Sequence, residues 1–347
     1  MARGATPAGI SHWKDIPAVP TRAFKEFEFT SLASRDRITV FHSSGTTGSK
    51  PSRHFHDAAS LQLYEAALLA WFQTHGLPET LGQRGGDGPI EPAGSACSLV
   101  RPPIDLEWLF LTPPAHLAPR SSLVWMFDAV RRLFGASPGA FAGVLEADGG
   151  WGLDVDLAIE LLETSTGQSR PVFVLGTAFS FVHLLDTLAE RGLSFRLPAG
   201  SRALETGGYK GRTRAVPKPK LRGLMATVLG IPPCAIIGEY GMSELSSQAY
   251  DRIVEVEPAF AATAGSRTSA GGPFRFPPWT RSRVISPESG DEVGEGATGL
   301  LRVYDLANVR SVLAVQTEDL ATRRGDGFEF LGRSARAEAR GCSLMSV

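Results

Sequence analysis

Hydrophobic and polar positions follow a helical period in three stretches of the first half of the chain. The clearest is 58–75, where Leu61, Tyr64, Leu68 and Trp71 lie three or four positions apart. Residues at this spacing share one face of an α-helix, so the pattern predicts a helix with one buried face. The same reasoning predicts helices over 121–134, capped by Ser121 or Ser122 and ended by Gly135, and over 154–164.

A run of apolar residues precedes a fourth helical stretch. Residues 171–176, PVFVLG, predict a buried strand, and residues 177–191 return to a helical period that ends at Gly192. Residues 201–212 predict a short strand that runs into a Gly-Gly turn. Strands that alternate with helices predict an α/β fold with a mainly parallel sheet covered on both faces.

The pattern changes after about residue 280. Strand-like runs follow one another there, and RGDG at 324–327 predicts a hairpin turn. We therefore expect one core over 1–347, with an α/β body over 1–279 and a β-rich part with a C-terminal tail over 280–347. Residues 79–104 are rich in Gly and Pro and predict a long surface connection.

Composition narrows the class of protein. The chain has 347 residues, 43% hydrophobic and 20% charged, which is typical of a globular protein. Its formal net charge of -1 argues against binding to nucleic acid through a general positive field. The three cysteines are odd in number and far apart, so we expect a reducing compartment. We find no signal peptide and no membrane span in the sequence and therefore predict a cytoplasmic protein.

One loop carries the residue types that bind phosphate. In SSGTTGSK, Gly45 and Gly48 allow the backbone to approach a ligand closely, and Lys50 supplies positive charge. Hydroxyl groups come from Ser43, Ser44, Thr46 and Thr47. The loop differs from a Walker A motif, because its glycines are three apart and Pro51 follows the lysine. An ordinary polar turn remains the alternative interpretation of this loop alone.

Four further motifs follow in order: ETGGYKG at 205–211, EYGMSE at 239–244, QTEDL at 316–320 and FLGR at 330–333. Together with the loop they resemble the adenylate-forming superfamily, which activates carboxylic acids with ATP as acyl-AMP. With PRSSLVWMF, VLGTAFSFVHLLD and RGCSL, the resemblance narrows to the acyl-protein synthetases. These are the ATP-dependent subunits of the bacterial luminescence fatty-acid reductase complex.

The resemblance implies a set of residues that bind ATP. The loop over 43–50 would hold the β- and γ-phosphates, with Thr46 and Thr47 as the leading hydroxyls. Asp319 would accept both ribose hydroxyls, with Arg333 beside it. The adenine would lie between the turn after 206 and the Tyr240 ring, which agrees with a Gly-Gly turn that admits a flat base. The residues assigned to the adenine are Gly207, Gly208, Tyr209 and Tyr240. Gly241 and Met242 are also assigned to ATP binding, and Ser243 would meet the phosphates together with Glu244.

Glu244 is the implied ligand of Mg²⁺. A hard cation that bridges phosphate oxygens prefers a carboxylate oxygen as its protein ligand. The alternative interpretation of Glu244 and Asp319 is a pair of solvated carboxylates, and that of Arg333 is a surface cation.

The chain ends fourteen residues after Arg333. The resemblance therefore leads us to expect that the small C-terminal swivel domain of the superfamily, and the lysine it carries, are absent. Lys50 and Lys210 are the candidates to supply the missing cation. For Lys210, an exposed side chain is the alternative.

Cys342 is the implied acyl acceptor. In acyl-protein synthetases the activated acyl group passes to a cysteine near the C-terminus, and here Cys342 stands in ARGCSLMSV beside Arg340. A neighbouring arginine favours the thiolate, which is the nucleophilic form. A structural cysteine in the tail is the alternative. Cys97 and Cys234 lie in apolar segments and are expected to be structural.

The roles of two further sets of side chains remain open. His116 and Phe179 are candidates for lining an acyl pocket, although a buried histidine and ordinary core packing would explain them as well. His54 and His56 lie two positions apart, but no third ligand accompanies them, so we do not predict a zinc site.

The function expected from these observations is ATP-dependent activation of a fatty or otherwise apolar carboxylic acid, followed by acyl transfer to a thiol. That thiol is expected to be Cys342, and a reductase the next partner. The alternatives are an acyl-CoA or amide ligase with a small thiol or amine acceptor, and a catalytically silent subunit that binds nucleotide. The sequence does not determine the oligomeric state.

Overall fold

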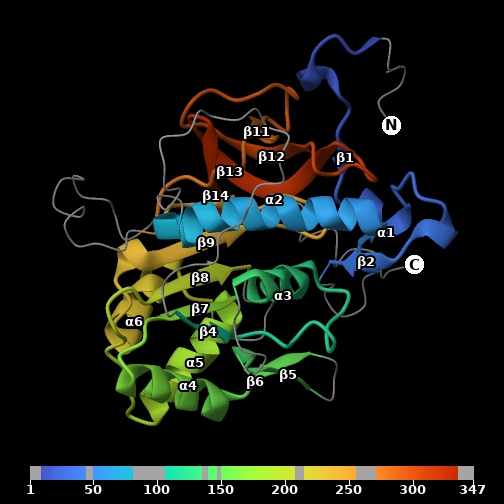
Figure 1. Cartoon of the computed structure of the whole chain (residues 1–347). Helices are drawn as coiled ribbons and strands as arrows, with labels where there is room; N and C mark the ends of the chain where they lie inside the picture. The colour runs from blue at the N-terminus through green and yellow to red at the C-terminus, as the bar shows by residue number, and fades with distance from the viewer. Residues whose placement is uncertain are drawn as a thin grey trace, which may run out of the picture.

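The structure is a computed structural model that describes residues 9–43, 50–80, 106–134, 140–146, 150–207, 215–254 and 271–334. It contains two five-stranded sheets and two hairpins. Figure 1 shows one sheet above the other, with a long helix, α2, running across the molecule between them. The Gly- and Pro-rich connection predicted over 79–104 lies almost wholly outside the described residues.

The lower sheet, called here the parallel sheet, has the strand order β10-β9-β8-β7-β4. Strands β4, β7, β8 and β9 run parallel, and β10 pairs with β9 in the antiparallel sense. Their bounds are β4 (Glu107–Phe110), β7 (Val172–Thr177), β8 (Arg202–Thr206), β9 (Ile236–Tyr240) and β10 (Ala249–Tyr250). All residues of β7, β8 and β9 are buried, which confirms the prediction of a parallel sheet covered on both faces.

The predicted helices are present with small shifts at their ends. Their observed bounds are α2 (Ala58–Gly76), α3 (Ser122–Phe134), α4 (Val155–Gly167) and α5 (Ala178–Glu190). Two helices that were not predicted are also present, α1 (Ala23–Glu26) and α6 (Lys218–Leu229). Local sequence fixes several ends: Asp57 accepts from the Ser60 N–H at 2.7 Å, and Thr177 accepts from the Ser180 N–H at 3.1 Å. Gly192 has a φ of 68°, a conformation that ends α5.

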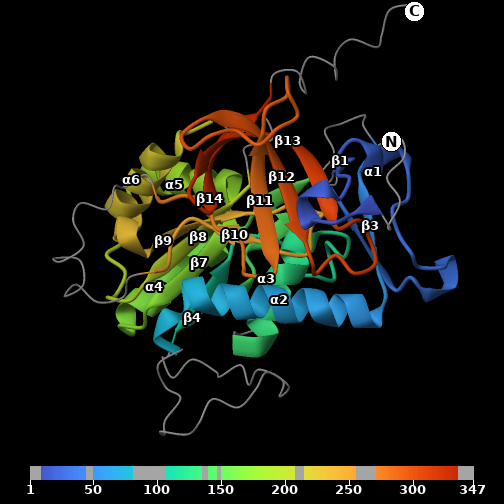
Figure 2. The same ribbon diagram turned by 90° about the horizontal axis from the view of Figure 1, so that it is seen from above.

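Helices cover both faces of the parallel sheet. Figure 2 shows α2 and α3 on one side and α5 and α6 on the other. Phe72 of α2 stacks on Phe173 of β7 with 5.6 Å between ring centroids. A large hydrophobic core fills this part of the molecule and includes Phe127, Phe181 and Leu185. Burial of such side chains is the main favourable term in folding.

The upper sheet, called here the C-terminal sheet, has the order β1-β13-β12-β11, with β14 paired to β13. Its bounds are β1 (Val19–Pro20), β11 (Thr280–Ile285), β12 (Thr298–Asp305), β13 (Ala314–Arg324) and β14 (Gly327–Arg333). The hairpin predicted at 324–327 is confirmed, because Arg324 pairs with Gly327. The N-terminal strand β1, which has no periodic signal in the sequence, pairs in parallel with β13.

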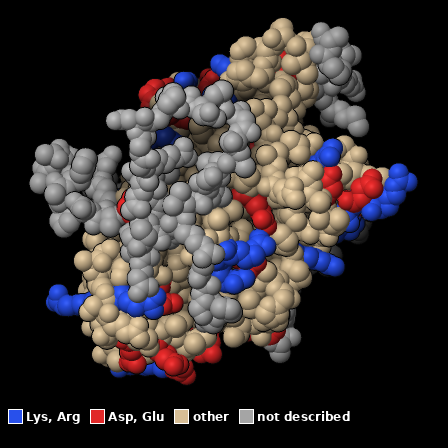
Figure 3. Space-filling view, viewed as in Figure 1, with Lys and Arg blue, Asp and Glu red and all other residues tan. Residues whose placement is uncertain are grey.

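Two hairpins complete the described fold: β2 (Thr39–His42) with β3 (Arg53–His56), and β5 (Gly143–Leu145) with β6 (Trp151–Leu153). No helix in the described part of the chain combines the length and apolar character needed to cross a membrane. On the face drawn in Figure 3, outside the grey atoms, acidic and basic side chains are interspersed. That face shows no large area of a single charge.

Candidate functional site

The β2–β3 hairpin presents the Gly- and Ser-rich loop. The Ser43 N–H donates to the Ser52 carbonyl at 3.2 Å, and the Ser52 N–H donates to Ser43 Oγ at 2.9 Å. These two bonds hold the ends of the loop together. The predicted phosphate-binding residues Ser44, Gly45, Thr46, Thr47 and Gly48 lie outside the described residues.

Lys50 lies at the foot of this loop and is exposed. It lines an open depression of about 260 Å³ together with Lys25, Glu26, Pro51 and Arg53. Neither Lys25 nor Lys50 forms an ion pair with another described residue. Three of the five residues that line the depression are basic: Lys25, Lys50 and Arg53. The two lysines have no acidic partner among the described residues.

The turn that follows β9 is bound to the hairpin. The Ser243 hydroxyl donates to the His42 carbonyl at 3.0 Å, and His54 Nδ1 donates to the Ser243 carbonyl at 2.8 Å. His54 and His56 are buried with 4.5 Å between their ring centroids. Burial lowers the pKa of His54 to about 4 and that of His56 to about 3, so both are neutral at pH 7. His54 anchors the EYGMSE turn against the base of the loop, whereas His56 Nδ1 lies 3.2 Å from the Ser60 hydroxyl at the start of α2.

Tyr240, at the end of β9, meets Asp319 of the C-terminal sheet. The Tyr240 hydroxyl donates to Asp319 Oδ2 at 2.7 Å, and Arg333 Nε lies 3.9 Å from Asp319 Oδ1. Asp319 and Arg333 are also direct partners in the β13–β14 register. Burial raises the pKa of the Asp319 carboxyl, and Tyr240 and Arg333 oppose this shift. Three of the predicted nucleotide-binding residues thus come together from two sheets.

The Tyr240 ring is itself almost enclosed, with 7% of the residue exposed. Its centroid lies between 5.2 and 6.2 Å from those of four phenylalanines: Phe274, Phe276, Phe328 and Phe330. Phe330 is 41% exposed and forms the outer wall of this group. The stacking of Tyr240 on adenine stays a prediction.

Glu244 lies on the same turn and is buried. Burial raises the pKa of its carboxyl, while the charge of Arg333 opposes this shift and that of Asp319 adds to it. The Asn308 amide donates to the Glu244 carbonyl at 2.9 Å and holds the backbone of the turn. Within the described residues, no group of three or more His, Cys, Asp or Glu side chains is arranged to hold a metal ion.

The other predicted residues are more dispersed. Gly207 follows β8 with a φ of 66°, a left-handed conformation that favours glycine. His116 is exposed, and Phe179, half-buried at the start of α5, lies 6.2 Å from the His183 ring. On the EYGMSE turn, Gly241 is exposed, and Met242 packs against the core of the C-terminal sheet. Four predicted residues, Gly208, Tyr209, Lys210 and Cys342, lie outside the described residues.

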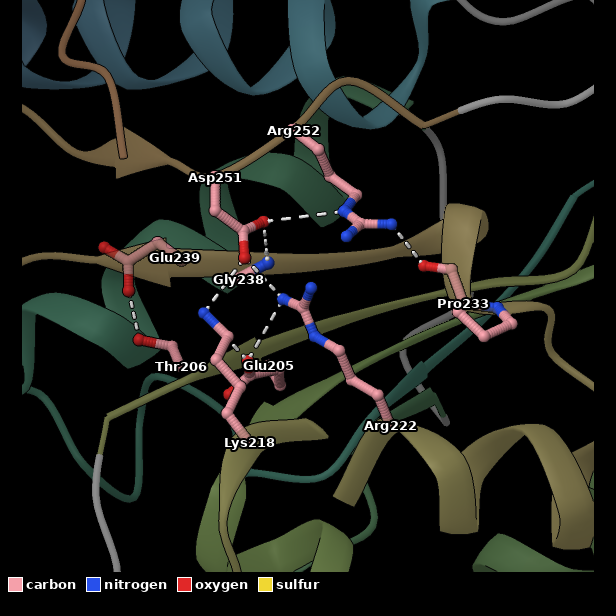
Figure 4. Close-up of polar contacts among 9 residues, drawn as sticks. All are labelled: Glu205, Thr206, Lys218, Arg222, Pro233, Gly238, Glu239, Asp251 and Arg252. Atoms are coloured by element: carbon pink, nitrogen blue, oxygen red, sulfur yellow. Dashed lines mark hydrogen bonds and ion pairs between the residues drawn. The ribbon is translucent and has the colours of Figure 1, made fainter. Parts of the chain in front are cut away.

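Sequence reasoning missed a group of buried charges beside the site. Asp251, just after β10, lies 2.5 Å from Arg222 Nη2 and 3.0 Å from Lys218 Nζ, while Glu205 lies 3.2 Å from the same Lys218 Nζ. Figure 4 shows these four side chains converging between α6 and the strands. Asp251 Oδ1 also accepts from the Gly238 N–H at 2.8 Å, so the group fixes β9. In the sequence, Glu205 stands out only as a charged residue within the strand RALET, which does not show what its carboxylate contacts.

A second missed residue is Glu239, which precedes Tyr240 on β9. Its carboxyl accepts a hydrogen bond from the Thr206 hydroxyl at the end of β8, as Figure 4 shows. Burial raises the pKa of Glu239 to about 7, and the Thr206 hydrogen bond opposes that shift.

Solved structures share this fold. ATP-bound MatB from Rhodopseudomonas palustris matches with a TM-score of 0.51 at 16% identity, over 87% of this chain and 49% of that chain. 2-Hydroxyisobutyryl-CoA ligase, in its postadenylation state with 2-HIB-AMP, matches with a TM-score of 0.60 at 14% identity, over 96% and 62%. The luciferase-like enzyme of the mealworm Zophobas morio matches with a TM-score of 0.50 at 16% identity, over 92% and 62%.

The chain thus spans about half to three fifths of the length of these proteins. No curated protein sequence matches it. A family model described as acyl-protein synthetase, LuxE, matches residues 147–346, more than half of the chain. The chain belongs to this family.

Proposed function

We propose that this protein activates a carboxylic acid with ATP and then transfers the acyl group to a thiol. In the first step a carboxylate oxygen of the acid attacks the α-phosphorus of ATP, acyl-AMP forms and pyrophosphate leaves. In the second step a thiolate attacks the acyl carbonyl carbon, a thioester forms and AMP leaves. Both steps depend on positioning and on neutralising negative charge.

The observation that carries this proposal is the meeting of Tyr240 and Asp319. The two residues belong to different sheets, yet a 2.7 Å hydrogen bond joins them at the carboxyl end of the parallel sheet. Ligands of open parallel sheets bind at that end of the strands. The family match covers both residues and also Glu244 and Arg333.

Each described residue has a proposed role that suits its surroundings. Asp319 accepts hydrogen bonds from the ribose hydroxyls, sharing its carboxylate with Tyr240, and Arg333 stabilises its ionised form. Ser243 and the hairpin hold the turn against the loop over 44–49, where we propose that the phosphates bind. Lys50 adds positive charge at the foot of that loop.

Mg²⁺ would be held by Glu244. The chemistry of Glu244 suits a cation. Burial raises the pKa of its carboxyl, and a bound cation would stabilise the ionised form that burial disfavours. Without a cluster of three acidic or histidine ligands among the described residues, the remaining ligands would be phosphate oxygens and water. When bound, the ion would neutralise charge on the phosphates during adenylation.

The acceptor thiol is proposed to be Cys342, and a reductase the protein that takes the acyl group onward. The family match extends to residue 346 and therefore includes Cys342. We propose a fatty or otherwise mainly apolar acid as substrate.

ATP–pyrophosphate exchange with Mg²⁺, over a panel of carboxylic acids, tests adenylation in wild type and Cys342→Ala. We expect acid-dependent exchange in both proteins and a labelled acyl-protein only in wild type. Acyl transfer to added CoA or an amine in Cys342→Ala would favour a CoA or amide ligase. ATP binding without exchange for any acid would contradict the proposal and indicate a silent subunit.

A further inference from the structure

We propose that Glu239, Gln248 and Tyr250 form a polar subsite that receives a hydrogen-bond donor, an amine or a hydroxyl, carried by the carboxylic acid substrate. This inference rests on the proposed function, because it concerns the acid that is activated. The substrate would then be a mainly apolar acid with one such donor group.

The position of Glu239 connects it to the proposed site. It precedes Tyr240 on β9, and successive side chains of a strand point to opposite faces of a sheet. Tyr240 therefore contacts Asp319 on one face while Glu239 lies on the other, bonded to Thr206 at the carboxyl end of β8. A group attached to the activated acid needs only to pass the end of β9 to reach it.

Gly241 makes room for this carboxylate. A Cβ atom at Gly241 would lie 2.3 Å from Glu239 Oε1, a distance that no side chain tolerates. The Cγ atom of Gln248 would lie 3.6 Å from the same point. The Glu239 carboxylate and the Gln248 side chain thus approach one another directly beneath the backbone of the EYGMSE turn.

Tyr250 completes the group. It is the direct partner of Glu239 in the β9–β10 register, and Gln248, just before β10, lies with the Glu239 carboxylate on the same side of Gly241. The ionised form of Glu239 raises the pKa of Tyr250, as does burial, the largest cause. These three polar side chains therefore occupy one neighbourhood.

Two of the three have hydrogen-bonding capacity left over. Gln248 Oε1 and the Tyr250 hydroxyl are buried, with 6% and 1% of the residues exposed, and neither atom has a partner among the described residues. Buried polar atoms without partners destabilise the folded state, so a ligand that bonds to them is selected over one that cannot.

The chemistry of the group identifies what it would bind. The Glu239 carboxylate and the Gln248 carbonyl oxygen only accept hydrogen bonds, and the Tyr250 oxygen can accept one too. A plain alkyl chain would leave these atoms unpaired, whereas an ammonium group or a hydroxyl supplies donors. Burial raises the pKa of Glu239, in agreement with a carboxylate that forms no ion pair within the described part of the chain.

The test is ATP–pyrophosphate exchange with octanoic acid and with its amino- and hydroxyl-substituted analogues, each as a set of positional isomers. For wild type we expect kcat/KM for at least one substituted acid to exceed that for octanoic acid by about 10-fold or more. Glu239→Gln and Tyr250→Phe should lower this preference about 10-fold while exchange with octanoic acid persists. Glu288→Gln, an exposed carboxylate in the β11–β12 connection, is the control and should change neither.

The Glu239→Gln variant also distinguishes an ammonium ligand from a hydroxyl ligand. Glu239→Gln removes the negative charge and should weaken an ammonium ligand more than a hydroxyl ligand. The inference would be overturned if wild type preferred octanoic acid to every substituted acid. It would also be overturned if the preference for a substituted acid were the same in wild type, Glu239→Gln and Tyr250→Phe. If no acid supports exchange, the proposed function fails, and equilibrium binding of the same acids to wild type and Glu239→Gln then decides the subsite on its own.

Discussion

The two sheets of this molecule stabilise a buried aspartate in different ways. Beside the parallel sheet, Asp251 is paired with the cations Lys218 and Arg222. In the C-terminal sheet, Asp305 at the end of β12 is bonded to neutral donors, among them the Ser246 N–H at 2.9 Å and the Ser247 hydroxyl at 2.8 Å. No ion pair to Asp305 occurs among the described residues.

The difference appears in the pKa values of the two carboxyl groups. Burial alone would raise both, but Lys218 and Arg222 hold the pKa of Asp251 below its ordinary value. Burial raises the pKa of Asp305, because neutral donors compensate only part of the lost hydration. One fold thus uses ion pairing where α6 meets the strands and neutral hydrogen bonds where loops meet the C-terminal sheet.

The largest effect should come from breaking the ion-paired group. Asp251→Asn leaves Lys218 and the fully buried Arg222 with Glu205 as their remaining carboxylate, and it weakens the contact to Gly238. We expect the free energy of unfolding to fall by about 3–5 kcal/mol. Urea denaturation measures this, with the exposed Asp291→Asn as control; equal stability of the two variants would contradict the ion-pair account.

The second-largest effect should be a loss of enzymatic activity in Asp319→Asn. Asp319→Asn removes the charge that is proposed to bind the ribose hydroxyls, and we expect kcat/KM for ATP in pyrophosphate exchange to fall about 100-fold. Stability should change little, because the carboxyl is not held by a buried cation. Glu318→Gln is the matched control, since it lies next in the strand on the opposite face. A similar loss in both variants would argue against the ribose assignment.

Glu239 is a buried carboxyl of the parallel sheet that forms no ion pair with another described residue, so it also tests the comparison. Its pKa of about 7 lies above the unfolded value, so the folded state binds the extra proton and stability falls as pH rises from about 4.5 through 7. Glu239→Gln removes this titration. Relative to wild type, it should gain about 2 kcal/mol between pH 5 and pH 8 in urea denaturation. A gain independent of pH would contradict the shift.

The smallest effect should come from Asp305→Asn, at about 1 kcal/mol near neutral pH. The raised pKa of Asp305 means that wild type loses stability as pH rises through it, so the cost of the variant should shrink from pH 4 to pH 7. The cost of Asp251→Asn should instead shrink as pH falls below about 4, because a lowered pKa gives stability that acid removes. Parallel pH profiles for the two variants would refute the comparison.

Much of the fold could be predicted because its signals are local. The apolar run 171–176 and the helical period 58–75 reappear as elements with almost the predicted ends. The predicted cap Ser121 accepts a hydrogen bond from the Val124 N–H at 3.3 Å. The two-residue strand β1 could not be predicted, because its place depends on β13, far along the chain.

For the site, the motifs pointed to Tyr240, Asp319 and Arg333, which the structure brings together, and their role in nucleotide binding stays a prediction. Buried charges were missed, because a single Glu or Asp within a strand looks the same in sequence whether it faces water or a guanidinium. Only three-dimensional contact distinguishes Asp251 from a surface aspartate.

The pairing of β1 with β13 also bears on how the chain is made. Val19 leaves the ribosome early, whereas its partner Val315 follows about 300 residues later, on the order of tens of seconds at ordinary rates of synthesis. The parallel sheet can assemble in the meantime, because all its strands lie between residues 107 and 250. The C-terminal sheet, which supplies Asp319 and Arg333, cannot gain its edge strand β1 until β13 has been made. The proposed nucleotide site would therefore form late, on a body that is already folded.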